Sequence, residues 1–241
     1  MRVLVTGGTS GLGLAMAAAL TGRSGERARS VAAGLPGAVG LELDVRDESS
    51  VARAVDQAWS LLGGLDMLVN NAGIGMRTVN PRFMTEPRGF WETPVDGFRA
   101  VIDTNLTGYF LVAREVAPRL LAAGGGRIVN VSVSYSTMQR AGFSPYGPSR
   151  SGSEALSRVM AADLRGTGVT VNVLLPGGAT VTGMIPDDVP PGGPAFLMPE
   201  VMGPPIVWLA SDEAAGVHDE RIVAASFEAW LRDRSSQPSV E

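Results

Sequence analysis

The sequence contains no cysteine, no lysine and only one histidine, and each of these absences excludes a class of site. Without cysteine there is no disulfide framework and no thiolate ligand for a metal. A single histidine, His218, makes a histidine zinc site or a Ser-His-Asp triad hard to build. We therefore expect no metal site, and we expect His218 at the surface or in a loop.

Because the chain lacks lysine, all 20 of its basic residues are arginine. A site that would ordinarily use lysine must here use arginine. The formal net charge is −4 and no block of like charge occurs, so neither a nucleic-acid partner nor a basic membrane patch is expected. No apolar run is long enough to span a bilayer, and the sequence does not open on a signal peptide, which favours a cytoplasmic location.

What is present is the pattern of one α/β domain in 241 residues. Strands are predicted at 2–5, 39–45, 65–73, 127–134 and 169–178, and helices at 14–20, 47–64, 96–123 and 146–166. The apolar, β-branched strands predict a Rossmann-like, doubly wound, mostly parallel sheet with helices on both faces. In that architecture ligands bind beyond the carboxyl ends of the strands.

The segment 176–205 departs from this pattern because it holds eight of the 16 prolines. Regular structure is not expected in such a stretch. A long loop in a compact domain is usually a lid, a binding loop or disordered. We expect residues 178–205 to form a substrate lid, and the alternative is a plain surface loop.

Three motifs lie at the ends of predicted strands. The stretch 6–13 reads TGGTSGLG, and its glycines allow a tight turn and the close approach of a pyrophosphate to a helix N-terminus. Packing alone would also explain these glycines. The carboxylate of Asp44 could accept a hydrogen bond from an adenine amino group, or it could cap a turn. Asn71 and Gly73 suit a turn against a ligand, or a turn with no ligand.

Two polar features lie inside predicted helices. Asn105 is a poor helix former, which indicates a local role such as holding a water or bending the helix. Tyr146 precedes Arg150 by four residues, so the two side chains share one helix face. A phenol beside a cation is favoured in its ionised form and could transfer a proton. An ordinary surface pair is the alternative.

Together these motifs resemble the short-chain dehydrogenase/reductase family over almost the whole chain. The family pattern T-G-x-x-x-G-x-G matches 6–13, N-N-A-G matches 70–73, and the helical asparagine matches Asn105. The family tyrosine matches Tyr146, and the P-G turn after the sixth strand matches 176–177.

The resemblance implies an oxidoreductase that transfers a hydride between a nicotinamide and a small carbonyl or alcohol substrate, with Tyr146 as general acid or base. It also implies a homo-oligomer, a tetramer or dimer packed through the helices at 96–123 and 146–166. The residues expected to act in catalysis are Tyr146, Arg150, Asn105, Ser132 and Ser134. Those expected to contact the cofactor are Gly7, Thr9, Ser10, Gly11, Leu12, Gly13, Arg23, Ser24, Asp44, Val45, Asn71, Ala72, Gly73, Tyr146, Arg150, Pro176, Gly177, Ala179 and Thr180.

The chain departs from the family pattern at three places. Arg150 stands where the family has lysine, and arginine is longer, planar and permanently charged. The family's catalytic serine aligns with Val133, between Ser132 and Ser134, and strand alternation turns these neighbours to the other face unless the strand end is bulged. Residues 14–38 are too few for a helix, a strand and a second helix of normal length.

Arg23 and Ser24 occupy the place where the family reads the adenosine ribose, and an arginine fork suits a 2′-phosphate. The sequence therefore favours NADP, with NAD as the alternative. The departures keep two other hypotheses open. One is a non-catalytic dinucleotide-binding sensor or scaffold protein, and the other is a truncated fold that binds no cofactor.

Overall fold

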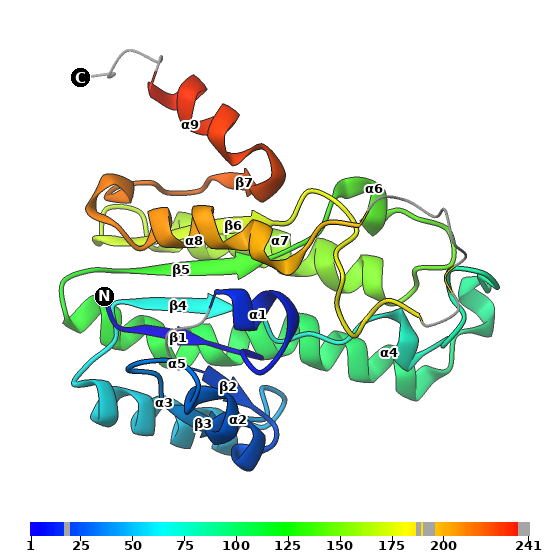
Figure 1. Ribbon diagram of the computed structural model, residues 1–241, viewed down its shortest axis with the longest axis horizontal. Coiled ribbons are helices and arrows are strands. Elements are labelled where there is room, and N and C mark those ends of the chain that lie inside the picture. The colour runs from blue at the N-terminus through cyan, green and yellow to red at the C-terminus, as the bar shows by residue number, and fades with distance from the viewer. Residues whose placement is uncertain (17–19, 187–188, 190–195, 236–241) are drawn as a thin grey trace.

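The computed structural model describes residues 1–16, 20–186, 189 and 196–235. In this part of the chain, seven parallel strands form one sheet in the order β3-β2-β1-β4-β5-β6-β7 (Figure 1). The strands are β1 (Val3–Val5), β2 (Leu20–Gly22), β3 (Gly40–Glu42), β4 (Met67–Asn70), β5 (Gly126–Val131), β6 (Val169–Leu175) and β7 (Arg221–Val223). The order reverses direction between β1 and β4. The doubly wound parallel sheet is thereby confirmed.

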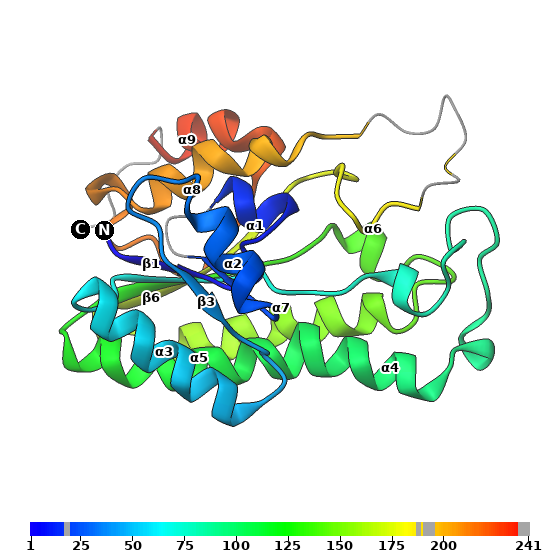
Figure 2. The ribbon, with the colours of Figure 1, turned by 60° about the horizontal axis from the view of Figure 1, so that its bottom comes forward.

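Helices cover both faces of this sheet, as Figure 2 shows. Below the sheet in that view lie α3 (Glu48–Leu62), α4 (Val95–Ile102), α5 (Gly108–Ala122) and α7 (Tyr146–Asp163), and above it lie α1 (Gly11–Ala15), α8 (Gly203–Leu209) and α9 (Phe227–Ser235). The remaining helices are α2 (Gly25–Ala32), which follows β2, and the short α6 (Tyr135–Met138). None of the helices in the described residues has both the length and the apolar character needed to cross a membrane.

The helix α3 illustrates how local sequence sets an element. The Asp47 side chain caps its start by accepting a hydrogen bond from the Ser50 N–H at 2.6 Å. Gly63 ends it in the left-handed region at φ 68°. Val51 and Val55, one turn apart, are buried against the sheet. The prediction of a helix at 47–64 is confirmed.

The core divides into two clusters, one on each face of the sheet. Leu4, Leu68 and Ile128 point to the side of α3, α5 and α7. Their strand neighbours Val5 and Val69 point to the side of α1, α8 and α9. This alternation follows from the two-residue period of a strand. It leaves the polar strand ends as the place where a ligand can lie.

The structure corrects the prediction between 14 and 38. A helix was expected over 14–20, but α1 ends at Ala15 and Leu20 already belongs to β2, while residues 17–19 of that prediction lie outside the described residues. Strand pairing overrides the helix propensity there, because Leu20 pairs with both Val5 and Gly40. The second strand is therefore present, although it has three residues, and α1 has five.

Candidate active site

The glycine-rich turn after β1 and the loop after β4 are joined by hydrogen bonds. The Thr6 hydroxyl accepts from the backbone N–H groups of Asn71 at 2.9 Å and Ala72 at 3.0 Å. The Asn71 side chain donates to the carbonyls of Thr6 and Gly7, at 3.0 and 3.2 Å. A Cβ on Gly7 would lie 2.8 Å from the Ala72 Cα. Gly7, Asn71 and Ala72, predicted separately as cofactor contacts, therefore form one unit.

The rest of the turn leads into the short α1. A Cβ on Gly13 would collide with the Gly7 carbonyl and the Asn71 amide, so only glycine fits. Gly11 has φ 54°, and the methyl group of Thr182 lies beside it. Ser10 begins α1 with an exposed side chain that makes no cap hydrogen bond. Of the other predicted contacts here, Thr9 packs against Gly22 and Leu12 against the core.

The expected adenosine side lies at the ends of β2 and β3. Asp44 is bound by Arg46, whose Nε and Nη2 donate to its carboxylate at 2.9 and 2.6 Å. These hydrogen bonds hold the pKa of Asp44 below its usual range, and attraction to Arg23 adds to the effect. The Ser24 hydroxyl instead caps α2, accepting from the Arg27 N–H at 3.3 Å. Val45 is buried and packs against Gly108 at the start of α5.

Asn105 lies in a five-residue π-helical turn, Asp103–Thr107, between α4 and α5. Its side-chain oxygen accepts from the Ile74 N–H at 2.9 Å, and its amide donates to the Ile74 carbonyl at 3.0 Å. The amide also donates to the Ser149 hydroxyl at 3.0 Å. Asn105 is fully buried and fixes the loop after β4 against the first turn of α7. A π-helical turn at a functional position is a recurrent feature of proteins.

The end of β5 carries the two predicted serines. Ser132 is buried, and its hydroxyl has no hydrogen-bond partner within the described part of the chain. Ser134 is the N-cap of α6, where its hydroxyl accepts from the Thr137 N–H at 3.3 Å. Between them, the carbonyl of Val133 accepts from Arg221 Nη2 at 2.8 Å. Of the two serine hydroxyls, the one on Ser132 is therefore the one that makes no hydrogen bond within the described residues.

Tyr146 begins α7, and Arg150 follows one turn later. Arg150 is 3% exposed, and its Nη1 donates to the Tyr109 hydroxyl at 2.8 Å and to the Val131 carbonyl at 3.0 Å. Its guanidinium carbon lies 5.4 Å from the centre of the half-buried Tyr146 ring. Its Nη2 lies beside Gly73, where a Cβ would collide with it. The predicted face shared by Tyr146 and Arg150 is present, and it points at the loop after β4.

Burial opposes the charge on Arg150, yet attraction to the phenols of Tyr109 and Tyr146 outweighs it and raises the pKa of Arg150 above its usual value. Burial likewise raises the pKa of Tyr109, although the neighbouring Arg150 acts in the opposite direction. Arg150 is therefore always a cation and Tyr109 a neutral phenol at working pH.

The loop after β6 closes this edge. The Pro176 carbonyl accepts from the Ala225 N–H at 3.0 Å, and Gly177 has φ 99°. The Leu197 N–H donates to the Ala179 carbonyl at 2.8 Å, and Thr180 forms a β-bridge with Leu197. The two legs of the predicted lid are thus paired at their base. Residues 187–188 and 190–195 of that lid lie outside the described residues.

Met184, on the first leg of the lid, lies against Gly75, where a Cβ would be 3.2 Å from its sulfur. Arg77 Nη1 holds the same leg by donating to the Ile185 carbonyl at 2.9 Å. By contrast, Trp91 is 77% exposed and packs edge-on against Phe90. The apolar contacts nearest Tyr146 come instead from Phe143, 6.3 Å away between ring centres.

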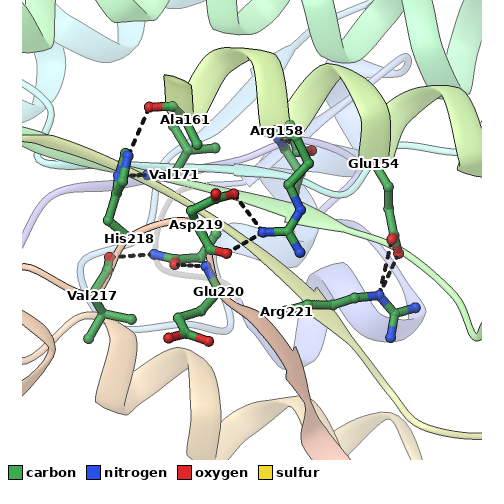
Figure 3. A network of polar contacts seen from close by, with 12 residues as sticks. Glu154, Arg158, Ala161, Val171, Val217, His218, Asp219, Glu220 and Arg221 are labelled. Carbon is green, nitrogen blue, oxygen red and sulfur yellow. Dashed lines mark hydrogen bonds and ion pairs between the residues drawn. The ribbon is translucent and has the colours of Figure 1, made fainter. Parts of the chain in front are cut away.

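The sequence reasoning missed three residues at this edge: Tyr109, Arg46 and Arg221. Arg46 had a signal, because it lies two residues after Asp44, the carboxylate at the end of a predicted strand. Tyr109 and Arg221 had no such signal, because they are placed by contacts with residues that are far away in the sequence. His218, in contrast, lies in a loop as expected, where Val171 N–H donates to its Nδ1 at 3.2 Å and its Nε2 is 2.8 Å from the Ala161 carbonyl (Figure 3).

These residues fit a nicotinamide dinucleotide. Arg150 Nε and the Ser132 hydroxyl are buried polar atoms without partners in the described residues, and both lie by the ends of β5 and α7. A buried donor or acceptor left unpaired is costly, so a bound polar group would satisfy them. Within the same described residues, no cluster of three or more His, Cys, Asp or Glu could hold a metal ion.

Comparison with known proteins agrees with this geometry. A family model described as short chain dehydrogenase matches residues 1–189. A 2-dehydro-3-deoxy-L-rhamnonate dehydrogenase (NAD(+)) of Sphingomonas sp. is 36% identical over 196 residues, which cover 78% of this chain and 74% of that protein. A 2,5-dichloro-2,5-cyclohexadiene-1,4-diol dehydrogenase of Sphingobium indicum is 31% identical over 232 residues, covering 88% of this chain and 89% of that protein.

Among solved structures, a gluconate 5-dehydrogenase from Burkholderia cenocepacia in complex with NADP and tartrate has a TM-score of 0.80 and 26% identity, and the match covers 95% of each chain. None of these similarities supports a non-catalytic sensor or scaffold. The chain belongs to the short-chain dehydrogenase family, and it is an NAD(P)-dependent oxidoreductase that acts on an alcohol or carbonyl group of a small molecule.

Proposed function

We propose that the chain transfers hydride between NADP(H) and a small alcohol or carbonyl compound, with Tyr146 exchanging a proton with the substrate oxygen. When bound, the nicotinamide supplies or accepts the hydride. The observation that carries the proposal is the buried cation Arg150 beside the half-buried Tyr146. A fixed positive charge stabilises the phenol oxygen when its proton has moved to the substrate.

The other residues at this edge support these two. Asn105 holds the backbone of Ile74, so the loop after β4 cannot shift away from Arg150. The Ser132 hydroxyl, which lacks an internal partner, is available to hydrogen-bond a polar group, whereas Ser134 caps α6. We infer that Tyr146 and Arg150 carry the proton chemistry, and that a serine hydroxyl assists from Ser132 in preference to Ser134.

The preference for NADP is supported by two cations on the adenosine side. Arg46 binds Asp44 directly, and Arg23 is close enough to lower the pKa of the same carboxylate. An adenosine 2′-phosphate would be attracted to this pair of guanidinium groups. One relative is named as an NAD(+) enzyme, so the sharpest evidence will be the ratio of activities with the two cofactors.

The proposed substrate class is supported by the apolar residues near the site and by the relatives. Phe143 offers apolar surface beside Tyr146, and Met184 offers apolar surface beside Gly75 in the loop after β4. The relatives are named for a sugar acid and a cyclic diol, which are small hydroxylated molecules. We propose a substrate of this kind, bound beside the described part of the segment 178–205. A cytoplasmic homo-oligomer, a dimer or tetramer, remains a prediction, and the exposed Phe110 and Val159 on α5 and α7 are consistent with such packing.

The test is turnover by the purified protein. NADPH and NADH consumption is measured against a panel of hydroxy ketones and cyclic ketones, and the reverse reaction against the alcohols. We expect Tyr146→Phe to lose about 10²-fold or more of kcat while dinucleotide binding is retained. The control is Tyr135→Phe, which removes an exposed phenol and should leave kcat unchanged. Full activity in Tyr146→Phe would refute the assignment.

A further inference from the structure

The feature that the family comparison leaves without a role is the buried tyrosine behind Arg150. Tyr109, on α5, is 1% exposed, and its side chain reaches the end of β5. Its hydroxyl donates to the Val131 carbonyl at 3.1 Å and accepts from Arg150 Nη1 at 2.8 Å. The same Nη1 donates to the Val131 carbonyl at 3.0 Å. Three polar groups from α5, β5 and α7 therefore close a hydrogen-bonded triangle.

Both ends of Tyr109 are fixed. Its backbone carbonyl accepts from the Asn70 side chain at 3.3 Å, and Asn70 in turn donates to Asn130 at 2.9 Å. The residue is thus tied to the neighbouring strands β4 and β5 as well as to Arg150. A hydroxyl held in this way presents its acceptor lone pair in one direction only, toward the guanidinium.

Arg150 needs such a partner. No carboxylate pairs with it in the described residues, because Glu154, one turn further along α7, is bound by Arg221. Burying a cation without an ion-pair partner costs free energy, unless hydrogen bonds and the faces of aromatic rings stabilise it. The Tyr109 and Tyr146 rings lie 5.6 and 5.4 Å from the guanidinium carbon. Nη1 is held by Tyr109 and Val131, whereas Nη2 lies beside Gly73 and Nε has no partner in the described residues.

We propose that Tyr109 is a positioning residue that holds the Arg150 guanidinium in the orientation in which it serves Tyr146. This inference rests on the proposed function, because it assigns Tyr109 a role through Arg150 in the same site. The planar guanidinium of an arginine is carried on a flexible side chain. Hydrogen bonds to one of its nitrogens hold the group, and therefore its positive charge, in one orientation. Tyr109 itself does not reach the opening of the site, since it is fully buried.

The first test needs no cofactor and no turnover. NMR of the arginine side-chain N–H groups of the wild-type protein, assigned through bonds to the Arg150 backbone, measures how slowly the Arg150 Nη protons exchange with water. We expect strong protection in the wild-type protein and its loss in Tyr109→Phe, with Tyr135→Phe as the matched control. Arg150 protons that exchange as fast as those of exposed arginines in the wild type would overturn the proposal, even if no variant folds.

The second test is a double-mutant cycle on kcat. Losing a hydrogen bond to a charged group should lower kcat of Tyr109→Phe about tenfold, with KM for the dinucleotide changed less than about twofold. In an Arg150→Ala background the same substitution should lower kcat no further, because Tyr109 acts through Arg150. An equal loss in both backgrounds would overturn the proposal. A wild-type protein that binds no dinucleotide would refute the proposed function, while the exchange test would still decide the role of Tyr109.

Discussion

The two ends of the proposed dinucleotide site differ in how deeply their arginines are buried. At the nicotinamide end, Arg150 is 3% exposed and held by α5 and β5. At the adenosine end, the side chains of Arg46 and Asp44 are 41% and 31% exposed. Charges interact more strongly where water is excluded, and exposed ion pairs contribute little. Under the proposed function, the comparison teaches that the chemistry would depend on a rigid, buried cation, whereas cofactor choice would depend on a solvated and adjustable one.

The largest effect is expected at the buried end. Arg150→Ala removes the cation beside Tyr146 and should lower kcat by about 10²-fold or more, since general acid–base catalysis contributes that much. Arg150→Lys should recover part of the lost kcat, because lysine keeps the positive charge but lacks the guanidinium group that Tyr109 binds. Steady-state kinetics and dinucleotide titration by tryptophan fluorescence measure the two steps separately. Equal kcat in the wild type and Arg150→Ala would show that the cation has no part in catalysis.

The next effect concerns Arg221, which is shown with Glu154 in Figure 3 and contacts the segment that carries the predicted serines. Arg221 donates to both oxygens of Glu154, at 3.1 and 3.0 Å, and to the Val133 carbonyl. Arg221→Ala would leave the largely buried Glu154 carboxylate unpaired, at a cost of about 3 kcal/mol in the free energy of unfolding. Urea unfolding measures this cost.

A neighbouring ion pair provides the matched control for that experiment. Arg158 binds Asp219 in the same network, but their side chains are 42% and 37% exposed (Figure 3). Arg158→Ala should therefore change the unfolding free energy by less than about 1 kcal/mol. Similar losses in Arg221→Ala and Arg158→Ala would mean that burial does not separate the two pairs.

At the exposed end, the expected effect is on cofactor choice. Arg23→Ala and Arg46→Ala should each lower kcat/KM for NADP about tenfold relative to NAD, because each removes one charge-assisted contact to the 2′-phosphate. Arg114→Ala is the control, since it removes an arginine of α5 that pairs with Glu48. A ratio of NADP to NAD activity that is unchanged in both variants would contradict the preference for NADP.

The difference between the two ends also explains what the sequence could predict. Strand-end motifs follow from local pattern, so the edge that joins 6–13, 70–73 and 176–177 was predictable from the alternation of strands and turns. Asn105 was recognised as unsuited to a regular helix, and the structure places a π-helical turn there. These features depend on neighbours in the sequence.

The orientation of Arg150 could not be predicted in the same way. Helical spacing placed it on the face of Tyr146, but its partner Tyr109 is 41 residues away in the sequence. Only the packing of both α5 and α7 on β5 brings the two together. The end of α1 was wrong for a similar reason, because pairing of Leu20 with β1 and β3 decides where the helix must stop.

The smallest effect is expected for the carboxylate at the exposed end. The pKa of Asp44 is lowered in the folded protein, so Asp44 adds stability above its unfolded pKa of about 3.9 and loses it as the pH falls through the folded value. Asp44→Asn should therefore reduce the unfolding free energy by less than about 1 kcal/mol at neutral pH. Below about pH 4 the stability curves of wild type and variant should converge. Parallel curves for Asp44→Asn would show that Arg46 and Asp44 are not coupled in solution, and the adenosine end would then hold two independent cations instead of a pair.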